Sequence, residues 1–390
     1  MANAKSEMTG FLTYLPTLAF VPHEAFALTF LFVLIRYQKD IIALFADFAK
    51  IKRSFILLSA IAVLSIINFF VGYFFFETEL DFPYPVLILA TYIIAMVINR
   101  KDLEVIFWLS VFEGFVVIAE FASGTNSFIP EYARMGSIDT DLLYFSRPMG
   151  LSYNSSIVAY KLLIAILIAE HLKRTGWMYR LAQVVLFTGI VLTFSRTIIV
   201  VLLIYFALSY ATRYIAGISE LLQFKIKVKN FLFLFIFTGF LAAGIYFAVA
   251  NFGTISNQFT RGRGNIEFSG REMIWPQFIG FIQEHPFAGN HSVKFYADYH
   301  GVPDAAHAHN SFLQILADQG VFIFALYMLF IALNINKRNI FIVIAFIIYS
   351  ITQYGIFWGI SLIDIVFIAF LLRSSQLIPT IENNAKPLSI

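Results

Sequence analysis

Apolar runs that approach the thickness of a lipid bilayer are the feature that most limits what this chain can fold into. A transmembrane helix needs about 20 mostly apolar residues, and residues 231–250 supply such a run with apolar side chains on every helical face. Hydrophobic residues make up 59% of the chain and charged residues only 13%, unlike an average soluble domain. A transmembrane β-barrel would instead need short strands that alternate apolar and polar residues. The sequence therefore predicts an all-α polytopic membrane protein.

The apolar runs predict about twelve transmembrane helices. Several runs are shorter than a full span, so we expect some pairs to tilt, or to form hairpins or re-entrant segments. Pro16, Pro22 and Glu24 interrupt the first two runs, and a cleavable signal peptide is therefore not expected. The predicted spans are residues 11–21, 24–35, 54–76, 85–98, 104–122, 151–170, 180–195, 197–211, 231–250, 310–335, 340–356 and 359–373.

The distribution of Lys and Arg predicts the orientation of these spans. With a cytoplasmic N-terminus, the cytoplasmic segments hold most of the 27 Lys and Arg residues, and acids such as Glu77 and Asp81 fall on the opposite face. We therefore expect N-terminal transmembrane helices in residues 1–252, one large periplasmic loop in 253–309, C-terminal transmembrane helices in 310–373 and a cytoplasmic tail in 374–390. The chain has no Cys, which excludes disulfides and thiolate catalysis.

Arginines gather on the face where the charge trend disfavours them. Arg147, Arg196 and Arg271 all fall on the predicted periplasmic face, as does Asn154 at the start of the sixth span. A guanidinium suits phosphate because it donates two parallel hydrogen bonds, so this group suggests an anionic ligand. Pairing with lipid headgroups or with loop acids is the alternative for any single arginine.

The start of the tenth span has its own pattern. Ser311 is expected to cap the helix and Gln314 to complete a capping box, which directs the positive end of the helix dipole at the periplasmic interface. That end attracts anions. Gly320 inside the helix suggests that a neighbouring segment packs closely there.

His309 lies directly before this helix, where a neutral imidazole can accept a proton. The alternative is a histidine that makes only a structural hydrogen bond. His307 and His309 also leave a metal site open, with Asp304 nearby, although no third ligand stands at a regular spacing.

Glu113 and Lys161 are expected to form a buried ion pair. Each lies near the middle of its predicted span, on consecutive antiparallel helices, so they fall at similar depth. A charge near the centre of a bilayer is costly unless it is paired.

Several of these segments together resemble the O-antigen ligase and polymerase superfamily. His309-Asn310, nine further residues and Gly320 are similar to that family's His-Asn signature after its large periplasmic loop. The turn that ends in Ser195-Arg196 resembles its Ser-Arg turn, and the segments 270–275 and 285–289 resemble its loop. The resemblance covers roughly residues 140–335. Trp275 stands where the ligase version often has Leu, which leaves ligase and polymerase open.

The resemblance implies a bundle similar to the GT-C glycosyltransferases in the bacterial inner membrane, with an active site that faces the periplasm. The implied reaction is an inverting, metal-independent transfer of a glycan from undecaprenyl diphosphate to a sugar hydroxyl, without a cofactor. An O-antigen ligase of lipopolysaccharide biosynthesis would use lipid A-core as acceptor, and a polymerase would use a lipid-linked repeat unit; neither partner is a nucleic acid. The expected catalytic base is His309, and the expected ligands of the donor diphosphate are Arg196, Arg271 and Arg147. Asn154, Asn310 and Gly320 are expected to support them.

A transporter of lipid-linked sugars is the alternative from another functional class. Transporters usually place polar groups at the middle of the membrane and contain related repeats. In this chain the polar residues gather at one face and no repeat is evident, so the sequence favours the transferase.

Overall fold

The computed structural model describes residues 8–46, 48–76, 84–124, 147–152, 154–173, 176–222, 270–299 and 301–377, with isolated positions between 228 and 250. These residues form helices, short connections and one two-stranded antiparallel sheet. The span predicted at 231–250 lies largely outside the described residues, as do Arg261, Arg263 and the tail after Leu377.

The helices of the N-terminal half come in two groups along the chain. The first group is α1 (Met8–Tyr14), η1 (Leu15–Thr17), α2 (Ala25–Arg36), α3 (Gln38–Ala46), α4 (Phe48–Phe75), η2 (Tyr84–Val86), α5 (Leu87–Val97) and α6 (Arg100–Ser123). The second group is α8 (Ser155–Leu172), α9 (Trp177–Leu192) and α10 (Arg196–Leu222).

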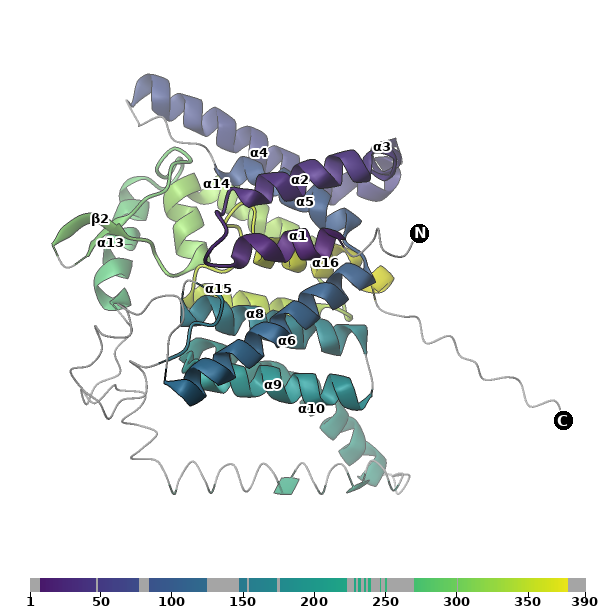
Figure 1. Cartoon of the computed structure of the whole chain (residues 1–390). Helices are drawn as coiled ribbons and strands as arrows, with labels where there is room; N and C mark the ends of the chain where they lie inside the picture. Colours follow the sequence, from purple (N-terminus) through teal and green to yellow (C-terminus); the bar gives the residue numbers. More distant parts are fainter. Residues whose placement is uncertain are drawn as a thin grey trace.

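The C-terminal half begins with a small helix and sheet and continues with three longer helices. Its elements are α13 (Arg271–Glu284), β1 (Ala297–Tyr299), β2 (Val302–Ala306), α14 (Ser311–Asn334), α15 (Ile340–Thr352) and α16 (Leu362–Leu377). Figure 1 shows α13 and β2 together at one end of the helical bundle.

Length and composition suit a membrane for many of the described helices. Four segments are long and apolar enough to cross a bilayer, namely 53–75 within α4, and helices α6, α8 and α14. Helices α2, α9 and α15, the first part of α10 and the η2–α5 segment are shorter and also apolar. The expected membrane protein with a helical bundle is therefore supported, while the number of about twelve spans stays a prediction.

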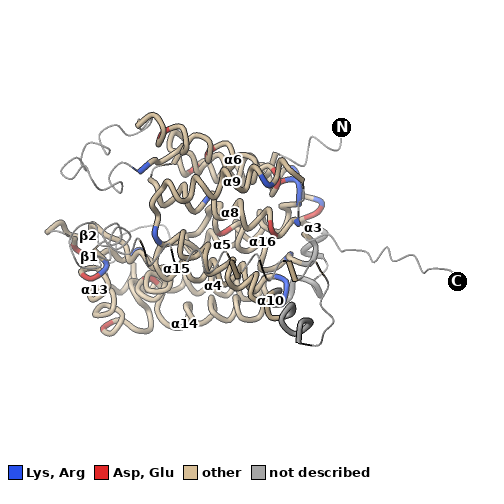
Figure 2. Tube along the Cα trace, turned by 90° about the horizontal axis from the view of Figure 1, so that it is seen from below, with Lys and Arg blue, Asp and Glu red and all other residues tan. Residues whose placement is uncertain are grey.

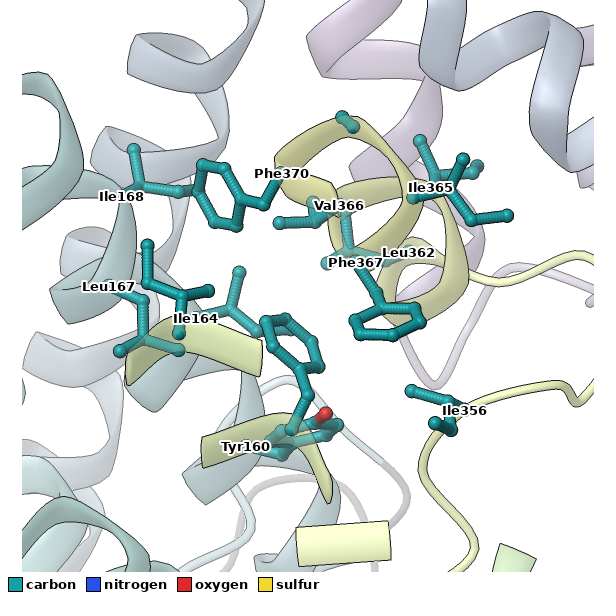
Figure 3. Packing of buried hydrophobic residues seen from close by; sticks show 14 of the residues in the cluster. Tyr160, Ile164, Leu167, Ile168, Ile356, Leu362, Ile365, Val366, Phe367 and Phe370 are labelled. Atoms are coloured by element: carbon teal, nitrogen blue, oxygen red, sulfur yellow. The ribbon is translucent and has the colours of Figure 1, made fainter. Parts of the chain in front are cut away.

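Helix α8 lies at the centre of the bundle. It packs against α6, α9, α10 and α16, and almost all of its side chains are buried. Figure 3 shows how Tyr160 and Ile164 of α8 face Phe367 and Phe370 of α16 in this core. Lys161 of α8 is buried as well, and a charged side chain within a membrane faces other helices and not lipid, which agrees with the central place of α8.

The two ends of the bundle differ in charge. Arg373 donates to the carbonyl oxygen of Met96 over 2.7 Å, and Arg100 donates to that of Leu172 over 3.3 Å, so these chain segments meet at one end. Figure 2 shows most Lys and Arg residues of the described chain at this end, away from α13 and β1. The charge distribution predicts that these chain segments lie on the same face of the membrane, and the contacts agree with this. Which end of the bundle faces the periplasm remains a prediction.

The connection between α15 and α16 is longer than the sequence suggests. The spans predicted at 340–356 and 359–373 are almost continuous, yet α15 ends at Thr352 and α16 begins at Leu362. Asp364 explains the difference, because its carboxylate accepts hydrogen bonds from the backbone N–H groups of Phe357 and Trp358 and thus holds residues 353–361 as a loop. The first predicted span is also divided, since α1 ends at Tyr14 and a turn separates η1 from α2.

Candidate functional site

A cavity of about 420 Å³ lies at the end of the bundle that carries α13. Its size falls within the range of small-molecule sites. Four stretches of chain form it: the connection from η1 into α2, the start of α8, the residues before α14, and the α15–α16 region. Its walls are formed by Pro16, Thr17, Val21, His23, Phe26, Asn154, Ser156, Ile157, Lys161, His307, His309, Tyr349, Gln353, Tyr354, Gly355, Trp358, Ser361, Leu362 and Ile363.

The predicted base, His309, lies in the wall of this cavity. Its Nδ1 is 3.4 Å from Oε1 of Gln353, and its ring centroid is 4.1 Å from that of His307. Burial, followed by the positive charge of Arg271, lowers the pKa of His309, and the contact with Gln353 only partly offsets this. Burial also lowers the pKa of His307, to about 3. The lowered pKa values favour the neutral form of both imidazoles, which is the form that accepts a proton.

Two side chains fix the segment that carries these histidines. The indole nitrogen of Trp275 donates to the carbonyl oxygen of Ala308 over 2.7 Å, and the N–H of Ala308 donates to Oε1 of Gln314 over 2.9 Å. Ala308 is fully buried between them. His309 follows with a φ of 49°, a left-handed conformation that a residue with a side chain keeps only where its surroundings impose it. The position of the His309 ring thus depends on Trp275 and Gln314.

Arg271 acts on His309 through its positive charge, which contributes to the lowered pKa of that imidazole. It is the first residue of α13 and donates from Nη2 to the carbonyl oxygen of Thr352 over 2.6 Å, directly before Gln353. Gly270 precedes it with a φ of 82°, and a Cβ at Gly270 would lie 2.5 Å from the ring of Tyr299. The Gly-Arg pair of the motif thus starts α13 beside the sheet and directs Arg271 at the end of α15.

Asn154 starts a central helix of the bundle. It is the N-cap of α8, and its side-chain oxygen accepts hydrogen bonds from the N–H groups of Ser156 and Ile157 over 3.0 and 2.9 Å. It lines the same cavity as His309. The structure therefore brings Asn154 and His309 to one cavity, although they are far apart in the sequence.

The predicted cap of α14 is wrong. Asn310, and not Ser311, is the N-cap: its φ and ψ are −155° and 113°, and its oxygen accepts from the N–H groups of Phe312 and Leu313. Ser311 is the first helical residue, and its hydroxyl accepts from the N–H of Gly355 over 2.9 Å. Gln314 binds Ala308 and so completes no capping box with Ser311. Ser311 and Gln314 form hydrogen bonds with neighbouring loops because both side chains are buried on the side of α14 that faces these loops.

The packing expected at Gly320 is confirmed. Gly320 has a φ of 75° and interrupts α14, and a Cβ there would lie 2.0 Å from the carbonyl oxygen of Phe287. The interruption frees backbone groups of α14, and the segment 286–292 binds them. Asn290 donates from its N–H to the carbonyl oxygen of Ala317 over 2.7 Å, and Val321 donates to that of Pro286 over 2.9 Å. Residues 285–289 and Gly320 of the family-like pattern therefore form one packing unit.

None of the three predicted arginines, Arg147, Arg196 and Arg271, is among the residues that line the cavity. Arg196 is the first residue of α10, which packs along α15, and it is half-buried. Arg147 begins the segment 147–152, which Glu120 of α6 holds by accepting hydrogen bonds from the N–H groups of Met149 and Gly150 over 3.0 and 2.8 Å. Their predicted contacts with a diphosphate remain predictions.

The buried ion pair of Glu113 and Lys161 is confirmed. Their Oε2 and Nζ atoms are 2.6 Å apart, and the side chains are 0% and 2% exposed. Glu113 also accepts hydrogen bonds from the hydroxyls of Tyr14 and Ser152, so it joins α1, α8 and the segment 147–152 to α6. Lys161 donates to Thr17 over 3.3 Å and forms part of the cavity wall.

Sequence reasoning missed most of the residues that surround His309. Gln353, Tyr354 and Trp358 come from the α15–α16 loop, which the hydropathy pattern had assigned almost wholly to two spans. The glycines and polar residues at 353–361 were the available signal, because such residues are rare inside a lipid-facing helix. Asp318 was missed as well: it is buried in α14 and accepts hydrogen bonds from Tyr84 and Gln314.

Within the described ranges, no group of three or more His, Asp or Glu side chains is arranged to hold a metal ion. Asp304, the residue considered beside the two histidines, is exposed, and its backbone N–H donates to the side chain of Asp298.

A comparison with protein families matches residues 181–328 to the family described as O-antigen ligase. The matched range runs from α9 into α14 and contains Arg196, Arg271, His309 and Gly320. The comparison with curated proteins gave no match.

Proposed function

We propose that this chain, whose residues 181–328 match the family described as O-antigen ligase, belongs to the O-antigen ligase and polymerase superfamily and is an O-antigen ligase of lipopolysaccharide biosynthesis. It transfers a glycan from undecaprenyl diphosphate to a sugar hydroxyl of lipid A-core, at the periplasmic face of the bacterial inner membrane. One observation carries the proposal: His309 lines a cavity of about 420 Å³, and burial together with the positive charge of Arg271 lowers its pKa.

The proposed chemistry is a single displacement. His309 accepts the proton of the acceptor hydroxyl, the hydroxyl oxygen bonds to the anomeric carbon of the donor, and the bond from that carbon to the diphosphate oxygen breaks. The configuration at the anomeric carbon is inverted. Undecaprenyl diphosphate leaves with the electron pair, and fixed positive charge stabilises it most where water is scarce. Arg271 supplies this charge together with Arg196 and Arg147, without a metal ion.

A polymerase of the same superfamily is the second candidate, because Trp275 departs from the ligase version of the loop pattern. A polymerase would use the same donor and base but a lipid-linked repeat unit as acceptor. Deletion of the gene separates the two. Free core together with lipid-linked polymer indicates a ligase, whereas core that bears one repeat indicates a polymerase.

Purified protein with lipid-linked donor and acceptor tests the proposed roles. His309→Ala is expected to lower turnover by roughly 10²–10⁴-fold while donor binding stays nearly unchanged. Arg271→Ala and Arg196→Ala should weaken donor binding as well as turnover, since the diphosphate is charged before and after transfer. Lys at these positions should rescue only partly, because an ammonium cannot make a two-pronged contact.

Arg338→Ala is the matched control, since Arg338 is exposed in the turn before α15, at the opposite end of the bundle. Full turnover by His309→Ala at saturating acceptor would remove the base assignment. Loss of activity on addition of a chelator would support the alternative that His307 and His309 bind a metal ion.

A further inference from the structure

Three aromatic rings pack against one another at steep angles in the cavity wall next to His309. Tyr354 and Trp358 come from the α15–α16 loop, and their ring centroids are 3.7 Å apart. The ring of His307 lies 6.0 Å from Tyr354 and 5.8 Å from Trp358. We call these three residues the aromatic wall. All three line the cavity and none is fully buried, so their rings remain accessible from it.

The loop that carries Tyr354 and Trp358 is held by buried side chains. Asp364, 2% exposed, accepts hydrogen bonds from the N–H of Trp358 over 3.0 Å and from the hydroxyl of Ser361 over 2.9 Å. The hydroxyl of Ser311 holds the other part of the loop at Gly355. In addition, Nζ of Lys294 lies 4.0 Å from the centroid of a Trp358 ring. The rings are thus fixed before any ligand binds, which lowers the entropy that binding costs.

The position of the aromatic wall separates it from an ordinary membrane anchor. Trp and Tyr are common where a membrane meets water, and there they face lipid headgroups. Here the rings line a cavity whose other walls include Asn154, Gln353 and Ser361, which offer hydrogen-bonding groups. A sugar ring matches this surface, because it has an apolar face of C–H bonds and a rim of hydroxyls. Apolar walls with a few placed polar groups are typical of small-molecule sites.

We propose that the aromatic wall is the acceptor subsite: it binds the sugar ring whose hydroxyl attacks the donor and holds that hydroxyl beside His309. This inference rests on the proposed function. A general base must lie within about 3 Å of the proton that it accepts, and the His307 ring of the wall is only 4.1 Å from the His309 ring. A sugar ring on the wall is therefore within reach of the base, as the acceptor must be, and the effects on the two KM values distinguish the acceptor from the donor.

Trp358→Leu is the central test, with Trp358→Phe as the conservative variant and Trp177→Leu as the control. Trp177 is 74% exposed at the start of α9 and does not line the cavity. Loss of one stacked aromatic predicts that Trp358→Leu raises the acceptor KM by up to about tenfold, a change that corresponds to about 1.4 kcal/mol. The donor KM and kcat should change little, and Trp358→Phe should recover most of the loss. An unchanged acceptor KM, or a rise in the donor KM alone, would overturn the assignment.

Binding without transfer separates this proposal from that of the reaction. The probes are soluble oligosaccharides released from lipid A-core and from the lipid-linked repeat unit, added to His309→Ala protein. We expect one of them to bind, and the same protein with Trp358→Leu to lose that binding while its melting temperature stays within a few degrees. If binding of the oligosaccharide requires Trp358 but His309→Ala retains full turnover, the sugar subsite is supported and the assignment of His309 as the base is refuted. If turnover requires His309 but binding of the oligosaccharide does not change in Trp358→Leu, the assignment of the base is supported and the sugar subsite is refuted.

Discussion

The hydrogen bond from Trp275 to the carbonyl oxygen of Ala308 gives a physical meaning to the residue at which this chain departs from the ligase pattern. A Leu at this position cannot donate a hydrogen bond. In this chain, therefore, the backbone between His307 and His309 is held by an indole, and Trp275 acts as a positioning residue for the proposed base.

Removal of the indole donor should affect turnover more than binding. Trp275→Phe keeps a ring but leaves a buried carbonyl without its partner, at a cost of about 1–3 kcal/mol. A base displaced by about 1 Å can lose up to 10²-fold in rate, so we expect kcat to fall by roughly ten- to a hundredfold with both KM values nearly unchanged. Trp177→Phe is the control. Equal kcat values for the two variants would show that Trp275 has only a packing role.

The pH dependence of transfer follows from the lowered pKa of His309. The base works only when neutral, so kcat/KM should be constant above its pKa and should fall as the pH drops through a value below 6.5. Arg271 contributes to the low pKa by its positive charge. In Arg271→Ala, the fall of the remaining kcat/KM at low pH should therefore occur at a higher pH than in the parent protein. If this fall occurs at the same pH or at a lower pH, a group other than His309 titrates.

At the scale of elements, the interrupted helix α14 depends on glycine. Gly320→Ala forces a Cβ against the carbonyl oxygen of Phe287 at 2.0 Å and adds the strain of a positive φ. The strain alone costs about 1–3 kcal/mol, and the clash with backbone adds to it. We expect a clear drop in the melting temperature and loss of transfer, because the helix that follows His309 is displaced.

Gly280→Ala is the matched control for this helix-breaking glycine. Gly280 lies in α13, and a Cβ there meets no neighbouring atom within 4 Å. Alanine favours the helix by up to about 1 kcal/mol, so stability should stay equal or rise. If both alanine variants behave alike in thermal unfolding, the docking of residues 286–292 on α14 does not depend on Gly320.

The elements also show how far sequence patterns reach. Hydropathy located most helices, and the motif residues Gly270, Arg271 and Gly320 lie where the resemblance implied a loop and a packed helix. The α15–α16 loop was missed, because the apolar residues Ile356, Phe357 and Ile360 hide the polar positions between them from a hydropathy average. The cap of α14 was misassigned by one residue, since Asn310 and Ser311 are both good caps and only the neighbouring loops distinguish them.

At the scale of the whole molecule, the ion pair of Glu113 and Lys161 connects elements that are far apart in the chain. Removing one partner leaves the other charge buried, which costs about 3–5 kcal/mol. Lys161→Met should therefore lower the melting temperature more than the double change Lys161→Met with Glu113→Gln. The pair Arg338→Met and Glu24→Gln, at two exposed and separate positions, should show additive effects. Additive effects for the buried pair as well would contradict a coupling between its charges.

The orientation of the whole bundle can be tested with single cysteines, because the native chain has none. Val302 in β2 is exposed at the end that holds the cavity, and Lys337 is exposed at the opposite end. An impermeant thiol reagent applied to intact spheroplasts should label Val302→Cys and should label Lys337→Cys only after the membrane is permeabilised. The reverse pattern would place the cavity on the cytoplasmic side.

Charge distribution predicted which chain segments meet at each end of the bundle, as the contacts of Arg100 and Arg373 show. It did not predict the cavity. Residues from the start of α8, from the connection before α2 and from the α15–α16 loop come together only through packing in three dimensions. A single sequence contains no periodicity that reports such contacts.

The cavity is assembled from stretches of chain that differ in how they relate to the family. His307 and His309 lie inside the matched range 181–328, whereas the walls formed by residues 16–26, 154–161 and 349–363 lie outside it. We therefore expect the matched range to carry the proposed chemistry and the two flanking blocks to set which glycan reaches the proposed base. Exchange of the flanking blocks between relatives should retune which glycans are joined while the reaction itself is retained.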